Sequence, residues 1–326
     1  MIFHYTSQEG FKGIIQEDGI HLWFSDVRYM NDRDELENAR RFFLQVAKDL
    51  FDKGDINEKI YEILKEVVCK SRNFSNTKKM YRILGPGKIE FKREREEGEF
   101  NKYICCFSQE QDSLPMWGHY LKNDNSGYAI GLDFENLIVK EFGIVRKVAD
   151  SNRIARNDER KVRNEEIYGP LDITYDDMEK VRTFRESMIT FAKEISRNND
   201  AEHKNQCVIA LQEWFENMAS YFKDYHFAYE KEERLVICIK SLDNPGVDIN
   251  QREEIRHRFV HGLVIPYIEV RIPNKKILKA VTISPQIGLN SEEKLLIESV
   301  KEYLKYLGYT HDINVRCSEI PLRYWG

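Results

Sequence analysis

Two glutamates, Glu230 and Glu232, are the residues whose type and spacing most directly suggest chemistry. They lie just before the apolar run RLVICI, which is typical of a buried strand. If the strand includes Glu230, both side chains point to the same face, because side chains alternate along a strand. Two carboxylates on one face repel each other unless they are solvated or bind something. The pattern predicts either a solvent-exposed strand edge or a site in which these carboxylates bind something.

A histidine near the N-terminus is the next candidate. His4 lies in the segment IFHYT, whose β-branched and aromatic residues predict a strand. A histidine inside such a strand needs a hydrogen-bond partner, which is either another part of the core or a ligand. The neighbouring Tyr5 and Thr6 add hydroxyl groups to the same segment. We therefore take His4, Tyr5 and Thr6 as candidate ligand-binding residues.

Two aromatic segments, WFSD with the following YMND, and MWGHY, supply further candidates. The first is either a ligand-binding edge or a strand end followed by a helix cap. The second is either an aromatic wall with a polar edge or a helix that packs its aromatic side chains into the core. The candidate ligand-binding residues in these segments are Phe24, Ser25, Tyr29, Trp117, His119 and Tyr120.

Other kinds of site are disfavoured by the sequence. The six cysteines are scattered without a CxxC pair, which argues against a disulfide framework or a zinc ribbon. His257 and His261 have the spacing of helical zinc ligands, but they flank a β-rich stretch without an evident third ligand. No GxGxxG follows a strand, and no P-loop or nucleophile-elbow signature is present. We therefore expect no metal site, no Rossmann fold and no P-loop.

Strands along the chain, with helices clustered in two insertions, must position these residues. The first 26 residues predict a strand, a short helix capped by Ser7, and a second strand. Further helices are predicted over 34–51, 57–70, 176–197 and 201–224, and strands at KYICCFS, YAIGLDF and RLVICI. Because the strands must pair across long gaps, we predict an α+β fold with a mostly antiparallel sheet. We expect one domain over 1–326, with helical insertions at about 34–100 and 151–225.

The composition is that of a folded protein without a membrane span. In 326 residues, hydrophobic types make up 41%, which is enough for a substantial core and excludes a wholly disordered chain. No apolar run approaches the roughly 18 residues that a membrane-spanning helix needs. The N-terminus does not resemble a signal peptide. We therefore expect a soluble, cytoplasmic protein.

The charge balance does not indicate a dedicated nucleic-acid binder. The net charge is −5, whereas such proteins are usually basic. Basic residues nevertheless cluster over 72–95 and 153–163. Each cluster is either a solvated surface or a contact for phosphate groups, so a nucleic-acid partner stays open.

The order of the motifs resembles that of a large, poorly characterised bacterial domain family. The matching segments run from residue 3 to residue 323 and cover almost the whole chain. They are FHYTS, LWFSD, YMND with Glu35, CCFS, MWGHY, GYAIGLDF, FAYEKEERLV, ISPQ and SEIPLR.

The opening segments and the glutamates are also similar to those of ADP-ribosyltransferases of the His-Tyr-Glu type. This resemblance implies a split antiparallel sheet and NAD as the substrate. It implies that His4 binds the ribose and amide of NAD and that Tyr29 or Phe24 stacks on nicotinamide. It also implies that Glu232 or Glu230 is catalytic, because a carboxylate stabilises the positive charge that develops on the ribose as the nicotinamide–ribose bond breaks.

The resemblances imply an enzyme that transfers ADP-ribose to a protein or nucleic acid, or to water, with a role in toxin action or phage defence. Two alternatives stay open. A non-catalytic nucleotide-binding sensor module of the same fold would bind NAD-like ligands without releasing nicotinamide. A nucleic-acid-binding or nuclease effector would bind with steep salt dependence and would not need NAD.

Overall fold

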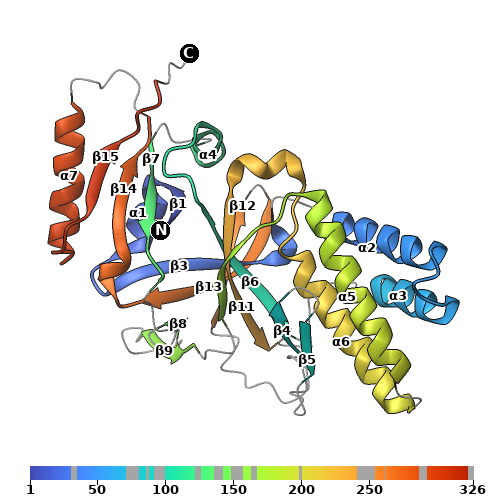
Figure 1. Ribbon diagram of the computed structural model, residues 1–326. Coiled ribbons are helices and arrows are strands. Elements are labelled where there is room, and N and C mark those ends of the chain that lie inside the picture. Colours follow the sequence, from blue (N-terminus) through green and yellow to red (C-terminus); the bar gives the residue numbers. More distant parts are fainter. Residues whose placement is uncertain are drawn as a thin grey trace.

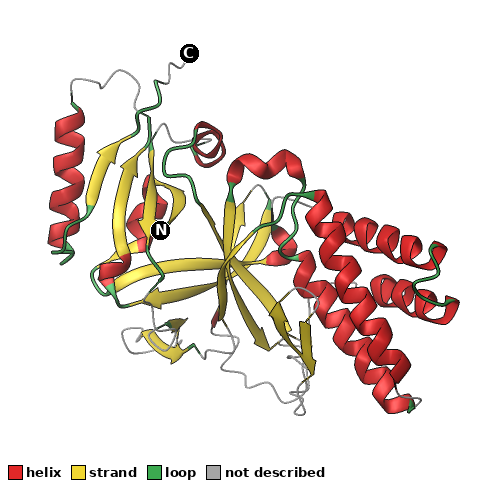
Figure 2. Cartoon of the chain, viewed as in Figure 1, coloured by secondary structure: helices red, strands yellow, loops and turns green. Residues whose placement is uncertain are grey.

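A large sheet and a separate group of helices make up the chain in this computed structural model (Figures 1 and 2). The structure describes residues 1–30, 35–70, 81–85, 88–91, 100–121, 126–135, 142–147, 157–162, 167–197, 200–240, 254–260, 262–285 and 292–321.

The helices agree closely with the periodicity of the sequence. They are α1 Gln8–Ile14, α2 Glu35–Asp52, α3 Glu58–Lys70, α4 Leu114–Tyr120, α5 Asp177–Arg197, α6 Ala201–Ala219 and α7 Glu293–Tyr306, with 3-10 helices η1 Val27–Tyr29, η3 Tyr225–Glu230 and η5 Lys275–Ile277. Helix α6 ends five residues before the predicted position, and the chain then turns into η3. Within the described residues, no helix combines the length and the apolar character required to cross a membrane.

The strands come from both ends and the middle of the chain. They are β1 Ile2–Ser7, β2 Ile15–Gln16, β3 Gly19–Asp26, β4 Tyr81–Gly85, β5 Lys88–Phe91, β6 Phe100–Ser108, β7 Gly127–Leu132, β8 Gly143–Lys147, β9 Asn157–Lys161, β10 Ile167–Asp172, β11 Glu232–Lys240, β12 Ile255–Val260, β13 Leu263–Ile272, β14 Leu278–Ile283 and β15 Asn314–Cys317.

Strand β6 is the point at which the sheet divides. One edge of β6 pairs with β11 along the full length of both strands. The other edge is shared by two strands: β1 pairs at one end, where Phe3 lies opposite Ser108, and β3 pairs farther along, where Ser25 lies opposite Ile104. From there β7, β14 and β15 follow β1, whereas β13 and β8 follow β3. Strands β1 and β3 therefore diverge from a common neighbour.

The sheet has the mixed, mostly antiparallel character that the sequence predicts. Among the described strands, each pairing is antiparallel except that of β14 with β15. The helices lie around this sheet and beside it (Figure 2). The α+β fold class is therefore confirmed.

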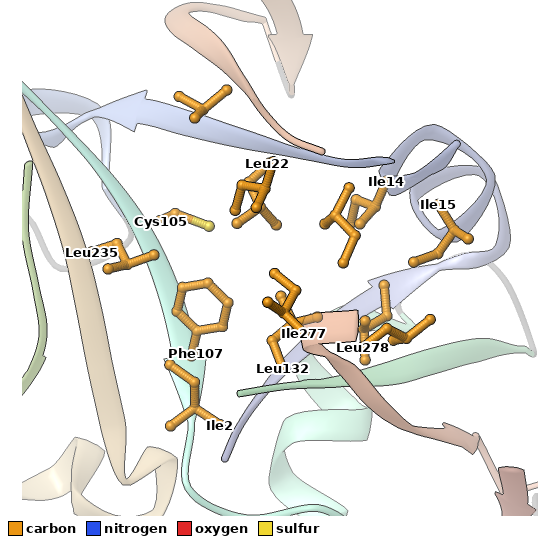
Figure 3. Packing of buried hydrophobic residues seen from close by; sticks show 14 of the residues in the cluster. Ile2, Ile14, Ile15, Leu22, Cys105, Phe107, Leu132, Leu235, Ile277 and Leu278 are labelled. Carbon is orange, nitrogen blue, oxygen red and sulfur yellow. The ribbon is translucent and has the colours of Figure 1, made fainter. Parts of the chain in front are cut away.

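The two largest hydrophobic clusters hold the sheet and the helices. The first lies against the sheet, where Leu22, Phe107, Leu132 and Leu278 pack together (Figure 3). The second lies between α2, α3, α5 and α6 at the opposite side of the molecule from α7 (Figure 1). In α2 the buried positions recur every three or four residues, which is the spacing of one helix face. The helices therefore form a lobe with a core of its own.

The two predicted insertions are not purely helical. The first contains the β4–β5 hairpin after α3, and the second begins with β9 and β10 before α5 and α6. Sequence periodicity missed β9 because all five of its residues, NDERK, are polar. Its strand conformation comes from pairing with β8, and that of β10 comes from pairing with β11, far away in the sequence.

We expect Gly19→Ala to destabilise the protein by about 1–3 kcal/mol. Gly19 has φ of +137°, and an added Cβ would lie 2.4 Å from the backbone oxygen of Ile272. Urea unfolding of the variant measures the loss. Gly13→Ala in α1 is the matched control, because its Cβ would meet nothing within 4 Å and alanine favours a helix by up to about 1 kcal/mol. Equal stability of the two variants would contradict the prediction.

Candidate functional site

A cavity of about 690 Å³ lies where β1 and β3 diverge from β6. This volume is in the range of sites that bind small molecules. Strand β1 contributes His4 and Thr6 to its wall, β3 contributes Trp23 and Ser25, and β12 contributes Arg258. The division of the sheet therefore creates a ligand-sized space that is lined by five of the predicted residues, namely His4, Tyr5, Thr6, Ser25 and Tyr120. We call it the large cavity.

His4 has a defined tautomer in this wall. Its Nδ1 lies 2.9 Å from the backbone oxygen of Cys106, and a carbonyl oxygen only accepts, so Nδ1 carries the proton. Burial lowers the pKa of His4, and the charge of Arg258 lowers it further against the effect of the Cys106 hydrogen bond. His4 is therefore neutral at neutral pH, and its Nε2 is an acceptor without a partner among the described residues.

Alternation along β3 decides which aromatic side chain reaches the large cavity. Trp23 and Ser25 line it, whereas Phe24, between them, is fully buried in the sheet core. Tyr29 lies in η1, is 37% exposed and lines neither this cavity nor its neighbour. Neither of the two aromatic residues expected to stack on nicotinamide is therefore placed at the cavity. The aromatic side chain of β3 that is placed there is Trp23.

A second, small cavity of about 40 Å³ adjoins the large one. Its walls include Glu230, Glu232, Lys223 and Arg234, and its volume suffices for water molecules only. Four residues line both cavities: Tyr5, Met30, Cys106 and Tyr120. His4 and the two glutamates are thus brought to neighbouring spaces and not to a single one.

Glu232 is buried in a dense network of charges. Its Oε1 accepts from Arg234 Nε at 2.6 Å, and its Oε2 accepts from Arg234 Nη2 at 3.0 Å and from Lys223 Nζ at 2.9 Å. The Cys106 thiol adds a further hydrogen bond. Burial alone would raise the pKa of Glu232, but Arg234 and Lys223 outweigh it and hold this pKa at about 2. Glu232 is therefore ionised, with little acceptor capacity left for a ligand.

Glu230 is the more accessible of the two carboxylates, and it does not share a strand with Glu232. It ends η3, and Lys231 then adopts a left-handed conformation with φ of 40° before β11 begins. The expectation that strand alternation places both glutamates on one face is therefore wrong. They meet instead through Lys223, whose Nζ donates to Glu230 Oε2 at 2.5 Å. The Glu230 side chain is 18% exposed, against 4% for Glu232.

Tyr5 and Trp117 position helix α4, and of the two only Tyr5 also lines a cavity. The Tyr5 hydroxyl donates to the backbone oxygen of Glu110 at 2.8 Å and accepts from the backbone nitrogen of Ser113 at 3.0 Å. Its ring packs edge-on against Trp117, which is 1% exposed and lines neither cavity. Trp117 Nε1 donates to Asp112 Oδ1 at 2.7 Å. These contacts fix the helix that carries His119 and Tyr120.

His119 joins α4 to the turn that carries the glutamates. Its Nε2 lies 2.6 Å from the hydroxyl of Tyr229, and the two rings are nearly parallel, with centroids 5.7 Å apart. Tyr229 precedes Glu230 directly. His119 and Tyr120 both line the small cavity, and Tyr120 reaches the large one as well. The MWGHY segment therefore contributes to the site mainly through its last two residues.

The described residues include only part of the segments considered for metal and nucleic-acid binding. Across the described ranges, no group of three His, Cys, Asp or Glu side chains is arranged to hold a metal ion. His257 is exposed on β12, and His261 lies outside the described residues. Most of the two basic clusters, over 72–95 and 153–163, also lies outside them.

A family of uncharacterised proteins matches part of the chain. A protein-family model described as DUF2971, a protein of unknown function, matches residues 116–235. This segment runs from α4 to the first residues of β11 and includes Tyr120, Lys223, Glu230 and Glu232. The match fits the uncharacterised domain family expected from the motifs. No curated protein gives a match. No solved structure gives one either.

We expect Glu232→Gln to lower the free energy of unfolding at pH 7 by about 3 kcal/mol. This is the free energy that corresponds to a shift of the Glu232 pKa from 4.5 to about 2 on folding. A carboxyl group with a depressed pKa stabilises the fold above its unfolded pKa. This contribution is lost as the pH falls from 4.5 to 2. Urea unfolding as a function of pH should therefore show a steep loss for the wild type and a shallower one for the variant.

The control for this loss is Glu62→Gln on the surface of α3. Glu62 is also paired with a lysine, Lys65, but its side chain is 59% exposed, so we expect a change below about 1 kcal/mol. Parallel pH profiles of the wild type and Glu232→Gln would contradict the depressed pKa. If the variant does not fold, the acid unfolding of the wild type between pH 4.5 and 2 remains as the test.

Proposed function

We propose that this protein binds NAD in the large cavity, cleaves its nicotinamide–ribose bond and transfers ADP-ribose to a macromolecular acceptor. The observation that carries the proposal is the position of His4. It lies at the division of the sheet, in a ligand-sized cavity that adjoins the cavity of Glu230 and Glu232. Separate parts of the sequence, which the family resemblance associates with NAD, are thus brought together.

The neutral state of His4 supports a role in ribose binding. With the proton on Nδ1 held by Cys106, Nε2 accepts a hydrogen bond, and ribose hydroxyl groups are donors. Ser25 and Thr6 add hydroxyl groups to the same wall. These residues would orient the nucleotide before the reaction, which is a positioning role.

Of the two carboxylates, Glu230 suits the catalytic role better. Bond cleavage leaves positive charge on the ribose, and a carboxylate near it stabilises the transition state. Glu232 is already bonded to Arg234, Lys223 and Cys106. The Glu230 carboxylate bonds only to Lys223 among the described residues, and it is partly exposed. In this proposal Glu232 positions Lys223 and Arg234, and Glu230 contacts the ribose or the acceptor.

A non-catalytic nucleotide-binding module is the second candidate, and one observation favours it. The carboxylate at the start of β11, which the resemblance makes the first choice for catalysis, is saturated by hydrogen bonds. Such a protein would bind NAD in the large cavity and release no nicotinamide.

The test is nicotinamide release from NAD, measured chromatographically with cell lysate supplied as a source of acceptor. We expect release by the wild type and a loss of about 100-fold or more in Glu230→Gln, because removing one electrostatic catalytic group typically costs this much. His4→Ala should raise the NAD concentration needed for half-maximal rate. Each variant is compared at a temperature at which unfolding experiments show it to be native.

Glu233→Gln is the matched control for this experiment. Glu233 lies on β11 beside Glu232, accepts a hydrogen bond from Gln109 Nε2 at 3.1 Å and lines neither cavity. We expect its rate to equal that of the wild type. Absence of release by the wild type would overturn the enzymatic proposal. Calorimetric titration with NAD would then decide whether the binding module takes its place.

A further inference from the structure

Two arginines on one face of β12 have different surroundings. Arg256 and Arg258 are two residues apart, so their side chains point to the same side of the strand. Arg256 Nη1 donates to Glu269 Oε2 on β13, which neutralises its charge. Arg258 lies opposite Ile265 in the same hairpin, and its Nη2 donates to the uncharged Ser25 Oγ at 2.9 Å. Only Arg256 therefore has a carboxylate partner among the described residues.

The charge of Arg258 is exposed to the large cavity without compensation. Its Nε is buried and has no hydrogen-bond partner within the described part of the chain. The one described carboxylate that lines this cavity is Glu9, which forms no ion pair with Arg258. Burial lowers the pKa of Arg258, and the largest opposing contributions come from Tyr267, Cys105, Tyr120 and Cys106, none of which is a carboxylate. A partly buried, uncompensated guanidinium is costly unless a ligand supplies the missing anion.

The geometry of the guanidinium indicates the class of anion. Its planar array of N–H donors matches the oxygen atoms of phosphate better than a single point charge does. The cavity of about 690 Å³ offers space for more than a free ion. It also holds the Trp23 ring and the hydroxyl groups of Thr6 and Ser25, which suit a base and a sugar.

We propose that Arg258 is the phosphate-binding residue of the large cavity and that it holds the diphosphate of a nucleotide ligand, with Ser25 fixing the guanidinium. This proposal rests on the proposed function in so far as the cavity is a nucleotide site, but it does not need the ligand to be cleaved. It assigns a role to the β12–β13 hairpin, which lies outside the segment that the family model matches.

Calorimetric titration with ADP-ribose, ADP, adenosine and inorganic pyrophosphate tests the proposal. We expect both diphosphate nucleotides to bind the wild type at least tenfold more tightly than adenosine, with an affinity that falls as salt is raised. In Arg258→Gln the affinity for ADP-ribose and ADP should fall at least tenfold, whereas that for adenosine should stay the same. Arg258→Lys should recover part of the loss, because lysine keeps the charge without the planar fork.

Lys301→Gln removes one positive charge from the exposed side of α7 and controls for net charge. We expect it to bind all four compounds as the wild type does. Tighter binding of ADP-ribose than of ADP would identify a ligand with a second ribose beyond the diphosphate, and equal binding a nucleoside diphosphate; both support the site. Unchanged ADP-ribose and ADP affinity in Arg258→Gln, or failure of both to bind the wild type, would overturn it.

The measurement separates this proposal from the enzymatic one. If the protein binds ADP through Arg258 but releases no nicotinamide, the phosphate site is supported and the transferase proposal is contradicted. If Arg258→Gln releases nicotinamide at the wild-type rate and binds NAD with the wild-type affinity, the enzymatic proposal is supported and the phosphate site is contradicted.

Discussion

The buried contact between Glu232 and Arg234 is the interaction on which the rest of the site depends. Arg234 is fully buried on β11, and its Nη1 donates to the backbone oxygen of Ser220 at the end of α6 at 2.7 Å. Glu232 in turn holds Lys223, which follows α6. One carboxylate thus ties the central strands to the helical lobe. Burying these charges is costly, and the network is stable only while every member keeps its partner.

The division of the sheet at β6 creates a ligand-sized cavity next to this charge network. Because β1 and β3 pair with different parts of one edge of β6, the sheet leaves a space between them that none of the described strands fills. The His4 ring occupies one side of this space and bonds to Cys106, whose own side chain reaches the cavity of Glu232. The two cavities are therefore separated by little more than the side chains that line both.

Local patterns in the sequence predicted the fold class, most helices and the approach of His4, Ser25 and Tyr120 to one region. These patterns gave wrong predictions where the position of a side chain depends on pairing between strands that are far apart in the sequence. Phe24 faces the core because the register of β3 places Trp23 and Ser25 at the cavity. Strand alternation alone does not indicate which face of β3 is turned to the core and which to the cavity. Glu230 departs from β11 because of the left-handed turn at Lys231. The role of Arg258 depends on a hairpin that reaches β3 across more than 200 residues.

The two cavities of the site differ in their charge. At the small cavity, Arg234 and Lys223 are neutralised by Glu232 and Glu230, so this end offers an anion little net attraction. At the large cavity, Arg258 has no such partner among the described residues. A ligand in which a diphosphate is followed by a ribose that gains positive charge as its glycosidic bond breaks would meet a cation and a carboxylate in that order. NAD has this order of groups, which is why the proposed cleavage and the proposed phosphate site support each other while resting on different residues.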